Sequence, residues 1–265
     1  AANFLTQLRD TTYKVSNNWM STCQYWKKLW TYDPPDDKKG AVDLYYFIKV
    51  LSDLLPPQSS VVGDAGSAYY VPCQSLSLKP PQKLIVPGAQ AEMGFTIPAS
   101  IGAYFASPTT TIIGITGDGS FQFNVQELQT IKHHNIPIKL FVWNNNGYLS
   151  IRKTQERFFD GSYIGTSPES GVSIPSIEKI TTAYGLSYVK INNSGECVEK
   201  IKYCIEDIEG PVVCEVMCNE QQEVFPTISS MKGEDGSIIG RPLEDMAPLL
   251  SRKEFYDNMI ISPIS

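Results

Sequence analysis

Histidine is scarce in this chain of 265 residues, which contains only the adjacent pair His133 and His134. The six cysteines form no C-x-x-C pair, so the sequence does not predict a zinc site. We expect free thiols and therefore a reducing, cytoplasmic compartment. The paired histidines follow a helical pattern and are expected to be solvated, without a catalytic role.

Long runs of basic or of apolar residues are also missing. The net charge is -6 and no Lys/Arg cluster stands out, which argues against a nucleic-acid partner. No apolar stretch reaches the roughly 18 residues of a membrane span. The first residues lack a basic segment followed by an apolar one, so we expect no signal peptide. The 42% of hydrophobic residues is enough for a sizeable core.

Three regions differ in composition. Residues 1–40 are expected to be a linker or the tail of a preceding domain, since residues 32–40 are rich in Pro, Asp and Lys. Residues 41–220 carry the regular patterns of a folded domain. Residues 221–265 are a Gly/Pro/Ser-rich stretch, predicted as a carboxyl-terminal tail.

Continuous apolar runs alternate with helical patterns in the middle region. Strands are predicted at 59–62, 84–86, 109–116, 138–143, 187–191 and 211–217. Helices are predicted at 44–55, 93–106, 121–134 and 196–206. This alternation predicts an α/β fold with a doubly wound, mostly parallel sheet and helices on both faces. A ligand is expected at the carboxyl ends of the strands.

The predicted strand 109–116 ends in Gly117-Asp118-Gly119-Ser120, directly before a helix. Glycines and a helix N-terminus at such a turn let backbone N–H groups approach a phosphate. Asp118 would repel that phosphate unless a cation lies between them. The motif alone also fits a simple helix cap formed by Asp118.

The next strand, 138–143, ends in Asn144-Asn145-Asn146-Gly147. Adjacent parallel strands place their carboxyl ends roughly 5 Å apart. Asp118 and Asn145 are therefore expected to face one ion, and their oxygen atoms suit magnesium. A backbone carbonyl of the turn offers a further ligand. Taken alone, residues 144–147 fit an ordinary loop equally well.

Together the two motifs resemble the thiamine diphosphate-binding signature, and residues 94–103 and 120–128 resemble the acetolactate synthase branch of thiamine enzymes. The similarity runs from about Asp43 to Pro226. It implies that the chain is the pyrophosphate-binding domain, the last third of a longer polypeptide.

The resemblance implies magnesium ligands at Asp118, Asn145 and, through its carbonyl, Gly147. The residues that it places at the thiamine diphosphate are Gly66, Ser67, Ala68, Ala91, Glu92, Met93, Asp118, Gly119, Ser120, Asn145, Gly147, Tyr148 and Leu149. Met93 matches the apolar residue that props the bent cofactor, and Glu92 is taken as a neighbour of the pocket. Ser67 and Ala68 depart from the family's Gly-Gln-His stretch, which leaves only backbone contacts there.

The implied activity is decarboxylation of a 2-oxo acid, pyruvate in the first instance, and transfer of the two-carbon unit to a carbonyl acceptor. The family's activating glutamate lies in the pyrimidine-binding domain, and nothing in this chain matches it. We therefore name no catalytic residue, and expect a homo-oligomer or pairing with a pyrimidine-binding domain. FAD in the full-length enzyme is left open. Thr154 replaces a Trp typical of the branched-chain enzymes, which leaves room for a larger or more polar acceptor, such as a keto-sugar nucleotide.

Three alternatives remain open at this point. The first is a thiamine-dependent 2-oxo acid decarboxylase or oxidase of the same fold. The second is a non-catalytic cofactor-binding subunit of a split enzyme. The third is a nicotinamide-binding domain, which the glycines between Gly114 and Gly119 support poorly because they do not form G-x-G-x-x-G.

Overall fold

A computed structural model describes residues 2–9, 16–30, 32, 39–232, 235 and 237–263 of the chain. The chain divides into two compact units, Ala1–Pro35 and Asp36–Ser265. Most of the linker expected at residues 32–40 lies outside the described residues. The smaller unit contains α1 (Ala2–Arg9) and α2 (Asn17–Leu29).

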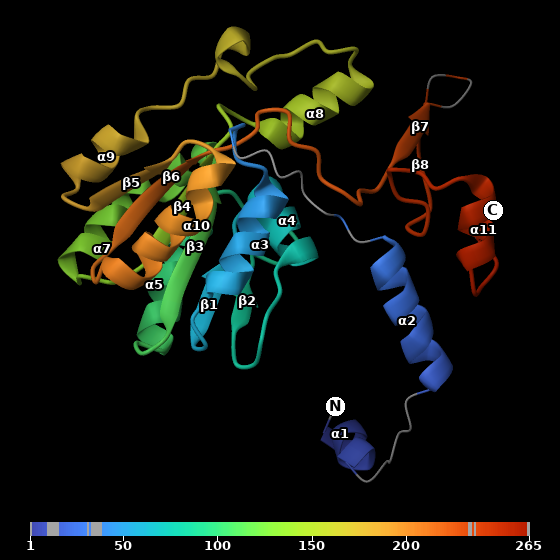
Figure 1. Ribbon diagram of the computed structural model, residues 1–265. Coiled ribbons are helices and arrows are strands. Elements are labelled where there is room, and N and C mark those ends of the chain that lie inside the picture. The colour runs from blue at the N-terminus through green and yellow to red at the C-terminus, as the bar shows by residue number, and fades with distance from the viewer. Residues whose placement is uncertain are drawn as a thin grey trace. The chain divides into compact units, whose positions relative to one another are not determined.

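The larger unit is built on one six-stranded sheet (Figure 1). Its strands are β1 (Ser59–Val62), β2 (Lys83–Ile85), β3 (Thr111–Gly117), β4 (Lys139–Asn144), β5 (Ser187–Ile191) and β6 (Val212–Met217). Their order across the sheet is β2-β1-β3-β4-β6-β5, and every neighbouring pair is parallel. The predicted α/β fold with a parallel sheet is confirmed. β3 and β4, the strands that precede the two motifs, lie side by side at its centre.

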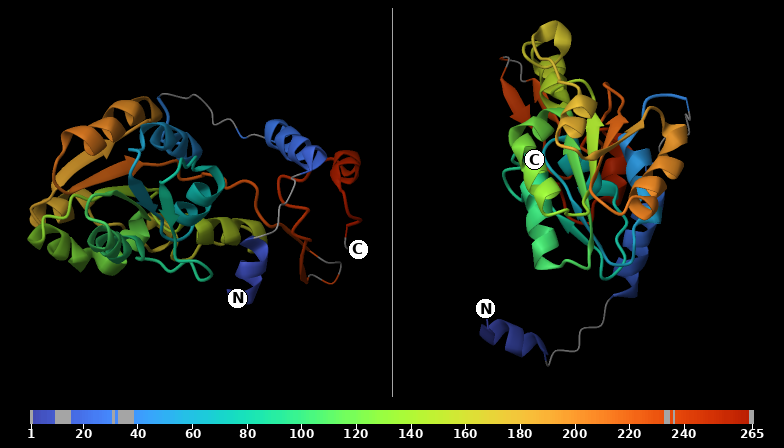
Figure 2. Two further views of the ribbon diagram at one scale, coloured as in Figure 1. Left: turned by 90° about the horizontal axis from the view of Figure 1, so that it is seen from below. Right: turned by 90° about the vertical axis from the view of Figure 1, so that its left-hand side faces the viewer.

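Helices cover both faces of this sheet, as the right-hand view of Figure 2 shows. The longer helices are α3 (Leu44–Leu54), α4 (Ser67–Ser75), α5 (Thr96–Ala106) and α8 (Leu149–Phe158). The shorter ones are α6 (Asp118–Phe121), α7 (Leu128–His133), α9 (Ile177–Ala183) and α10 (Cys197–Lys202). Short 3-10 segments lie at Gln122–Glu127, Pro168–Ser170 and Ser194–Glu196, and a π-helical turn at Tyr203–Asp207 follows α10.

Alternate residues of each central strand enter two separate hydrophobic cores, as the period of two in a strand requires. Ile113 and Phe141 pack with α3, α4 and α10 on one face. Ile112 and Leu140 pack with α5, α7 and α9 on the other. Because both faces are buried, the strands are apolar throughout, and this is why they read as continuous apolar runs.

The prediction of one continuous helix at 121–134 is wrong. The structure divides it into the end of α6, a 3-10 segment and α7, and Asn124 has a non-helical φ of −130°. The Asn124 amide donates to the carbonyl of Gly94 at 2.8 Å. A β-carbon at Gly94 would lie 2.6 Å from that of Phe123. The helix therefore breaks where the preceding loop packs against it.

The carboxyl-terminal residues contain more order than their composition predicts. They form β7 (Ser230–Lys232) and β8 (Ile238–Gly240), which pair antiparallel, and the helix α11 (Arg252–Asn258). Asp245 is buried and accepts hydrogen bonds from Arg241 at 2.8 Å and from Arg252 at 2.9 Å. These ion pairs bind the region before α11 to the helix.

Cysteines divide by exposure. Cys73 on α4 is exposed, whereas four cysteines of the larger unit are buried free thiols, Cys197, Cys204, Cys214 and Cys218.

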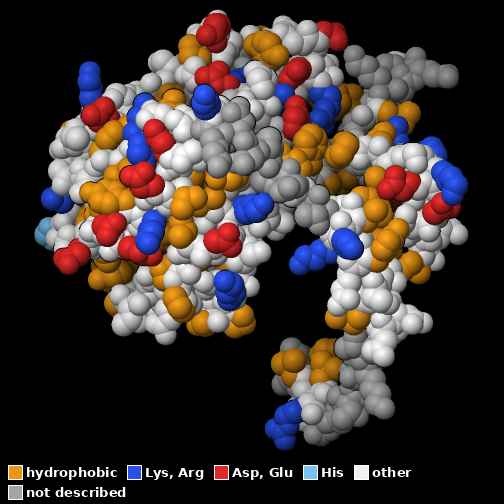
Figure 3. All heavy atoms as spheres, in the orientation of Figure 1, with side chains coloured by type: hydrophobic (Ala, Val, Ile, Leu, Met, Phe, Trp, Pro, Cys, Tyr) orange, Lys and Arg blue, Asp and Glu red, His pale blue; other side chains and the backbone are white. Residues whose placement is uncertain are grey.

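No helix in the described part of the chain is long and apolar enough to cross a membrane. On the face seen in Figure 3, acidic and basic side chains are intermixed over the larger unit.

Candidate functional site

Asp118 lies at the junction where β3 ends and α6 begins, and its side chain is only 1% exposed. Its Oδ1 accepts a hydrogen bond from the N–H of Gly119 at 2.7 Å. Its Oδ2 accepts from the N–H groups of Asn145 at 3.2 Å and of Gly147 at 3.0 Å. The carboxylate thus joins the ends of β3 and β4, which the sheet register places side by side.

Burial raises the pKa of Asp118 to about 6, even though hydrogen bonds from the backbone N–H groups oppose that rise. A carboxylate loses the solvation of its charged form when it leaves water, and dipoles of neutral N–H groups replace only part of it. A bound cation would stabilise the charged form directly. Burial thus disfavours the charged form of Asp118, and a cation at this place would favour it.

Asn145 supplies the second oxygen at this place. Its side chain is 4% exposed, and its Oδ1 is buried without a hydrogen-bond partner in the described part of the chain. A buried amide oxygen without a partner costs about 1–3 kcal/mol, so native proteins rarely leave one in this state. The unsatisfied oxygen next to a buried carboxylate fits a cation with oxygen ligands such as magnesium.

The turn after Asn145 contains two consecutive residues with a positive φ. Asn146 has a φ of 60° and Gly147 a φ of 134°. A β-carbon at Gly147 would lie 2.3 Å from the carbonyl oxygen of Thr166, so only glycine fits there. The N–H of Asn146 donates to the Asn144 side chain at 3.0 Å. These constraints fix the backbone of the turn that contains Gly147, whose carbonyl is the third predicted ligand.

Gly119 and Tyr148 meet across the same junction. A β-carbon at Gly119 would lie 2.4 Å from Cε1 of Tyr148, so the absence of a side chain lets the ring pack there. Ser120 and Leu149 are buried beside them. The structure therefore gathers the predicted residues of both motifs at one edge of the sheet.

The predicted stretch Gly66-Ser67-Ala68 lies at the start of α4. Gly66 has a φ of 56°, and a β-carbon there would lie 2.9 Å from Oγ of Ser150 on α8. Ser67 and Ala68 are buried. This stretch is thus placed against the first turn of α8, which directly follows the turn at Gly147.

Ala91, Glu92 and Met93 lie in the loop between β2 and α5. Ala91 has a φ of 50°, Glu92 is exposed, and Met93 is half-buried. Within the residues that the structure describes, no hydrogen bond joins these three to Asp118 or Asn145. The place of Glu92 beside the cofactor therefore stays a prediction.

Asp64, which sequence reasoning missed, fixes the loop that carries Met93. It is completely buried and accepts from the N–H groups of Gly94 at 2.9 Å and of Thr96 at 3.3 Å. It also accepts from the hydroxyl of Thr116 at 2.7 Å, two residues before Asp118. The signal in the sequence was an acid directly after a buried strand, at the carboxyl edge of the predicted sheet.

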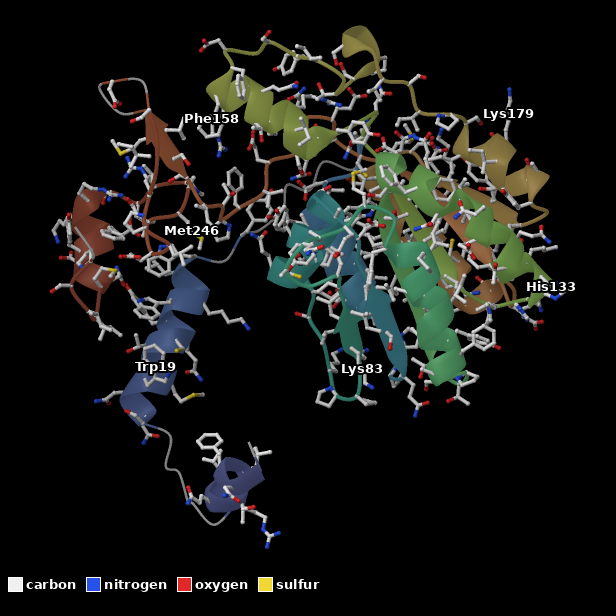
Figure 4. All side chains as sticks on the ribbon, turned by 180° about the vertical axis from the view of Figure 1, so that it is seen from behind. Trp19, Lys83, His133, Phe158, Lys179 and Met246 are labelled. Carbon is white, nitrogen blue, oxygen red and sulfur yellow. The ribbon has the colours of Figure 1, made fainter. Side chains whose placement is uncertain are left out.

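A pocket of about 620 Å³ opens beside α4 and α8, and two predicted cofactor residues, Ser67 and Leu149, line it, whereas Asp118 and Asn145 do not. Ser67, Leu149 and Thr154 line it from α4 and α8, and the segment from Gln222 to Ile228 closes another side. Phe158 on α8 and Met246 in the carboxyl-terminal region also line it, and Figure 4 shows where both lie. The exposed His133 lies far from them on the other side of the sheet.

The acid, the amide and the glycine turn lie at the carboxyl ends of two adjacent strands in a parallel sheet, which is where an α/β domain of this class usually binds its ligand. The family model "Thiamine pyrophosphate enzyme, C-terminal TPP binding domain" matches residues 64–216. The chain belongs to this family.

Curated relatives agree with this assignment. The chain is 31% identical over 199 residues to the acetolactate synthase isozyme 2 large subunit of Escherichia coli, which is 75% of this chain and 35% of the relative. It is 30% identical over 194 residues to the chloroplastic acetolactate synthase of Arabidopsis thaliana, 72% of this chain and 29% of the relative. It is 29% identical over 225 residues to the acetolactate synthase large subunit of Lactococcus lactis, which is 84% of this chain and 38% of the relative. The chain thus spans about a third of these relatives.

Proposed function

We propose that residues 41–220 bind thiamine diphosphate through a magnesium ion held by the side chains of Asp118 and Asn145 and by the carbonyl of Gly147. The single observation that carries the proposal is the buried, unpartnered Oδ1 of Asn145 next to the buried carboxylate of Asp118. A cation would satisfy the first group and stabilise the charge of the second.

The remaining predicted residues have supporting roles in this proposal. Gly119 and Ser120 contact the diphosphate, and Gly66 lets the backbone approach it. Met93 supports the bent cofactor, and Asp64 holds the loop of Met93 in place through Gly94 and Thr96. Thiamine diphosphate supplies an electron sink for the decarboxylation of a 2-oxo acid.

For the whole enzyme we propose decarboxylation of pyruvate and transfer of the two-carbon unit to a carbonyl acceptor, with a pyrimidine-binding domain as partner. The names of the relatives support this reaction. The pocket lined by Ser67, Leu149 and Thr154 is where we place the acceptor, because it opens directly beside the predicted cofactor residues. The small Thr154 side chain leaves room there for a polar acceptor.

Calorimetric titration of thiamine diphosphate with magnesium tests the cofactor site. Asp118→Ala should abolish magnesium-dependent binding, because the ion loses its only charged ligand in the proposed set. Asp53→Ala removes an exposed acid on α3 and should bind like the wild type. Equal affinity in Asp118→Ala and wild type would defeat the assignment.

The reaction is tested by product analysis after pyruvate is supplied to the complete enzyme. A ketol acid or a branched sugar as product supports transfer to an acceptor. Acetaldehyde or acetyl phosphate as the main product would instead identify a decarboxylase or an oxidase. Cofactor binding without turnover would favour a non-catalytic subunit.

A further inference from the structure

Arg152 on α8 is a buried cation whose side chain is only 5% exposed. Its Nη2 donates to the carbonyls of Asn146 at 3.2 Å, of Thr166 at 3.1 Å and, more weakly, of Asn145 at 3.4 Å. Its Nη1 donates to the carbonyl of Glu220 at 3.0 Å. Within the described part of the chain, no carboxylate forms an ion pair with it.

Such a group is costly to bury. A guanidinium loses its hydration in the interior, and main-chain carbonyls replace that hydration less well than a carboxylate does. Among the described residues, the Nε of Arg152 has no hydrogen-bond partner although it is buried, which adds to the cost. An uncharged side chain would avoid this cost, so we expect Arg152 to have a structural role that an uncharged side chain does not fill.

The contacts of Arg152 identify that role. The turn at residues 145–147 lies between two buried charges of opposite sign. Its carbonyls at Asn145 and Asn146 accept from Arg152, while its N–H groups at Asn145 and Gly147 donate to Asp118. The turn needs this support, because Asn146 and Gly147 both have a positive φ.

We propose that Arg152 is a positioning residue for the cation site. It holds the turn in the conformation in which Oδ1 of Asn145 and the carbonyl of Gly147 are available to an ion. Its planar fork reaches three chain segments at once, the turn, the loop at Thr166 and the segment at Glu220, which a lysine or a methionine does not reproduce. The cation-site part of the proposal rests on the proposed function.

Lys139 provides a matched control. It is also a buried cation, and its Nζ donates to the carbonyls of Ile208 and, at 3.0 Å, of Gly210. It begins β4, whereas the turn follows the end of the same strand. Lys139→Met therefore removes a buried charge of the same kind at the opposite edge of the sheet.

The first experiment needs no cofactor. Hydrogen–deuterium exchange of the backbone at residues 145–148 is measured in Arg152→Met, Arg152→Lys, Lys139→Met and the wild type. Loss of the fork should accelerate exchange there by about tenfold or more in both Arg152 variants, and leave it unchanged in Lys139→Met. Arg152→Lys keeps the charge and serves as the test if Arg152→Met does not fold. Wild-type exchange in a folded Arg152 variant would overturn the proposal.

The second experiment measures the magnesium concentration at half-saturation of thiamine diphosphate binding. We expect it to rise by about tenfold to a hundredfold in the Arg152 variants, as for other residues that orient metal ligands. It should stay within about twofold in Lys139→Met, even if that variant is less stable. If Arg152→Lys needs the same magnesium concentration as the wild type while Asp118→Ala does not bind, the role of Arg152 is refuted and the cofactor site is not. Unchanged binding in Asp118→Ala refutes the cofactor site itself.

Discussion

Substitution of Gly147 by alanine should destabilise the protein strongly. A residue other than glycine at a φ of 134° is strained by about 1–3 kcal/mol. The new β-carbon would lie 2.3 Å from the carbonyl oxygen of Thr166, so that carbonyl must move. It now accepts from the N–H of Tyr148 at 3.0 Å and from Arg152 at 3.1 Å. Loss of a neutral and a charged hydrogen bond brings the expected destabilisation to about 3–7 kcal/mol.

Gly102→Ala is the matched control, because it makes the same chemical change on α5. A β-carbon there meets nothing within 4 Å, and its backbone is helical. Alanine is favoured over glycine in a helix, so this variant should gain about 0.5–1 kcal/mol.

The free energy of unfolding of both variants is measured by denaturant titration followed by circular dichroism. The two substitutions should change it in opposite directions. A Gly147→Ala protein within about 1 kcal/mol of the wild type would refute the reasoning, since it would mean that the turn relaxes freely around a side chain.

Three further results are expected. Asp64→Ala removes the acceptor of three buried donors, of which the Thr116 hydroxyl keeps a weak second acceptor in the carbonyl of Gly117 at 3.4 Å, and should lower the free energy of unfolding by about 3 kcal/mol. Asp64→Asn, which keeps one acceptor oxygen, should lose less, and similar losses in both variants would contradict this. Iodoacetamide at neutral pH should label Cys73 in the native protein, because it is exposed, and none of the four buried cysteines, because their burial keeps the reagent out, also at Cys204, whose pKa the hydrogen bond with Cys214 lowers. Burial also raises the pKa of Cys197 to about 12, so adducts of native Cys197 in mass spectrometry would contradict this. The hydrogen bonds and charges of Arg252 and Arg241 lower the pKa of Asp245. The ion pairs therefore stabilise the folded protein fully above the ordinary carboxyl pKa, and this stabilisation is lost as the pH falls through the lowered pKa. Acid titration of stability should show this loss in the wild type and not in Asp245→Asn.

Much of the sheet could be predicted from the sequence because its strands are buried on both faces. The predicted strands 59–62 and 187–191 coincide with β1 and β5, and the others differ at their ends by one or two residues. The meeting of Asp118 and Asn145 followed from the same rule, since carboxyl ends of adjacent parallel strands share one edge. At these strands, the apolar pattern of the sequence and the parallel order of the sheet lead to the same arrangement.

Other features depend on contacts between distant segments, which no local pattern encodes. The helix after Phe121 breaks because Gly94 and Asn124 meet across 30 residues. Arg152 follows the polar pattern of an exposed helix, but the carbonyls of Thr166 and Glu220 come to it from later parts of the chain.

The strand order also determines when, during folding, the chain acquires its site. β3 and β4 are consecutive strands, so the loop that closes between Asp118 and Asn145 is short and its entropic cost is small. The bond between Arg152 and Glu220 closes a loop of 68 residues. During synthesis from the amino terminus, the two predicted ligands thus emerge and can pair well before the segment at Glu220, which is the last of the four carbonyl partners of Arg152 to be made. We expect a nascent chain to hold an assembled site that gains its last anchor when residue 220 has left the ribosome.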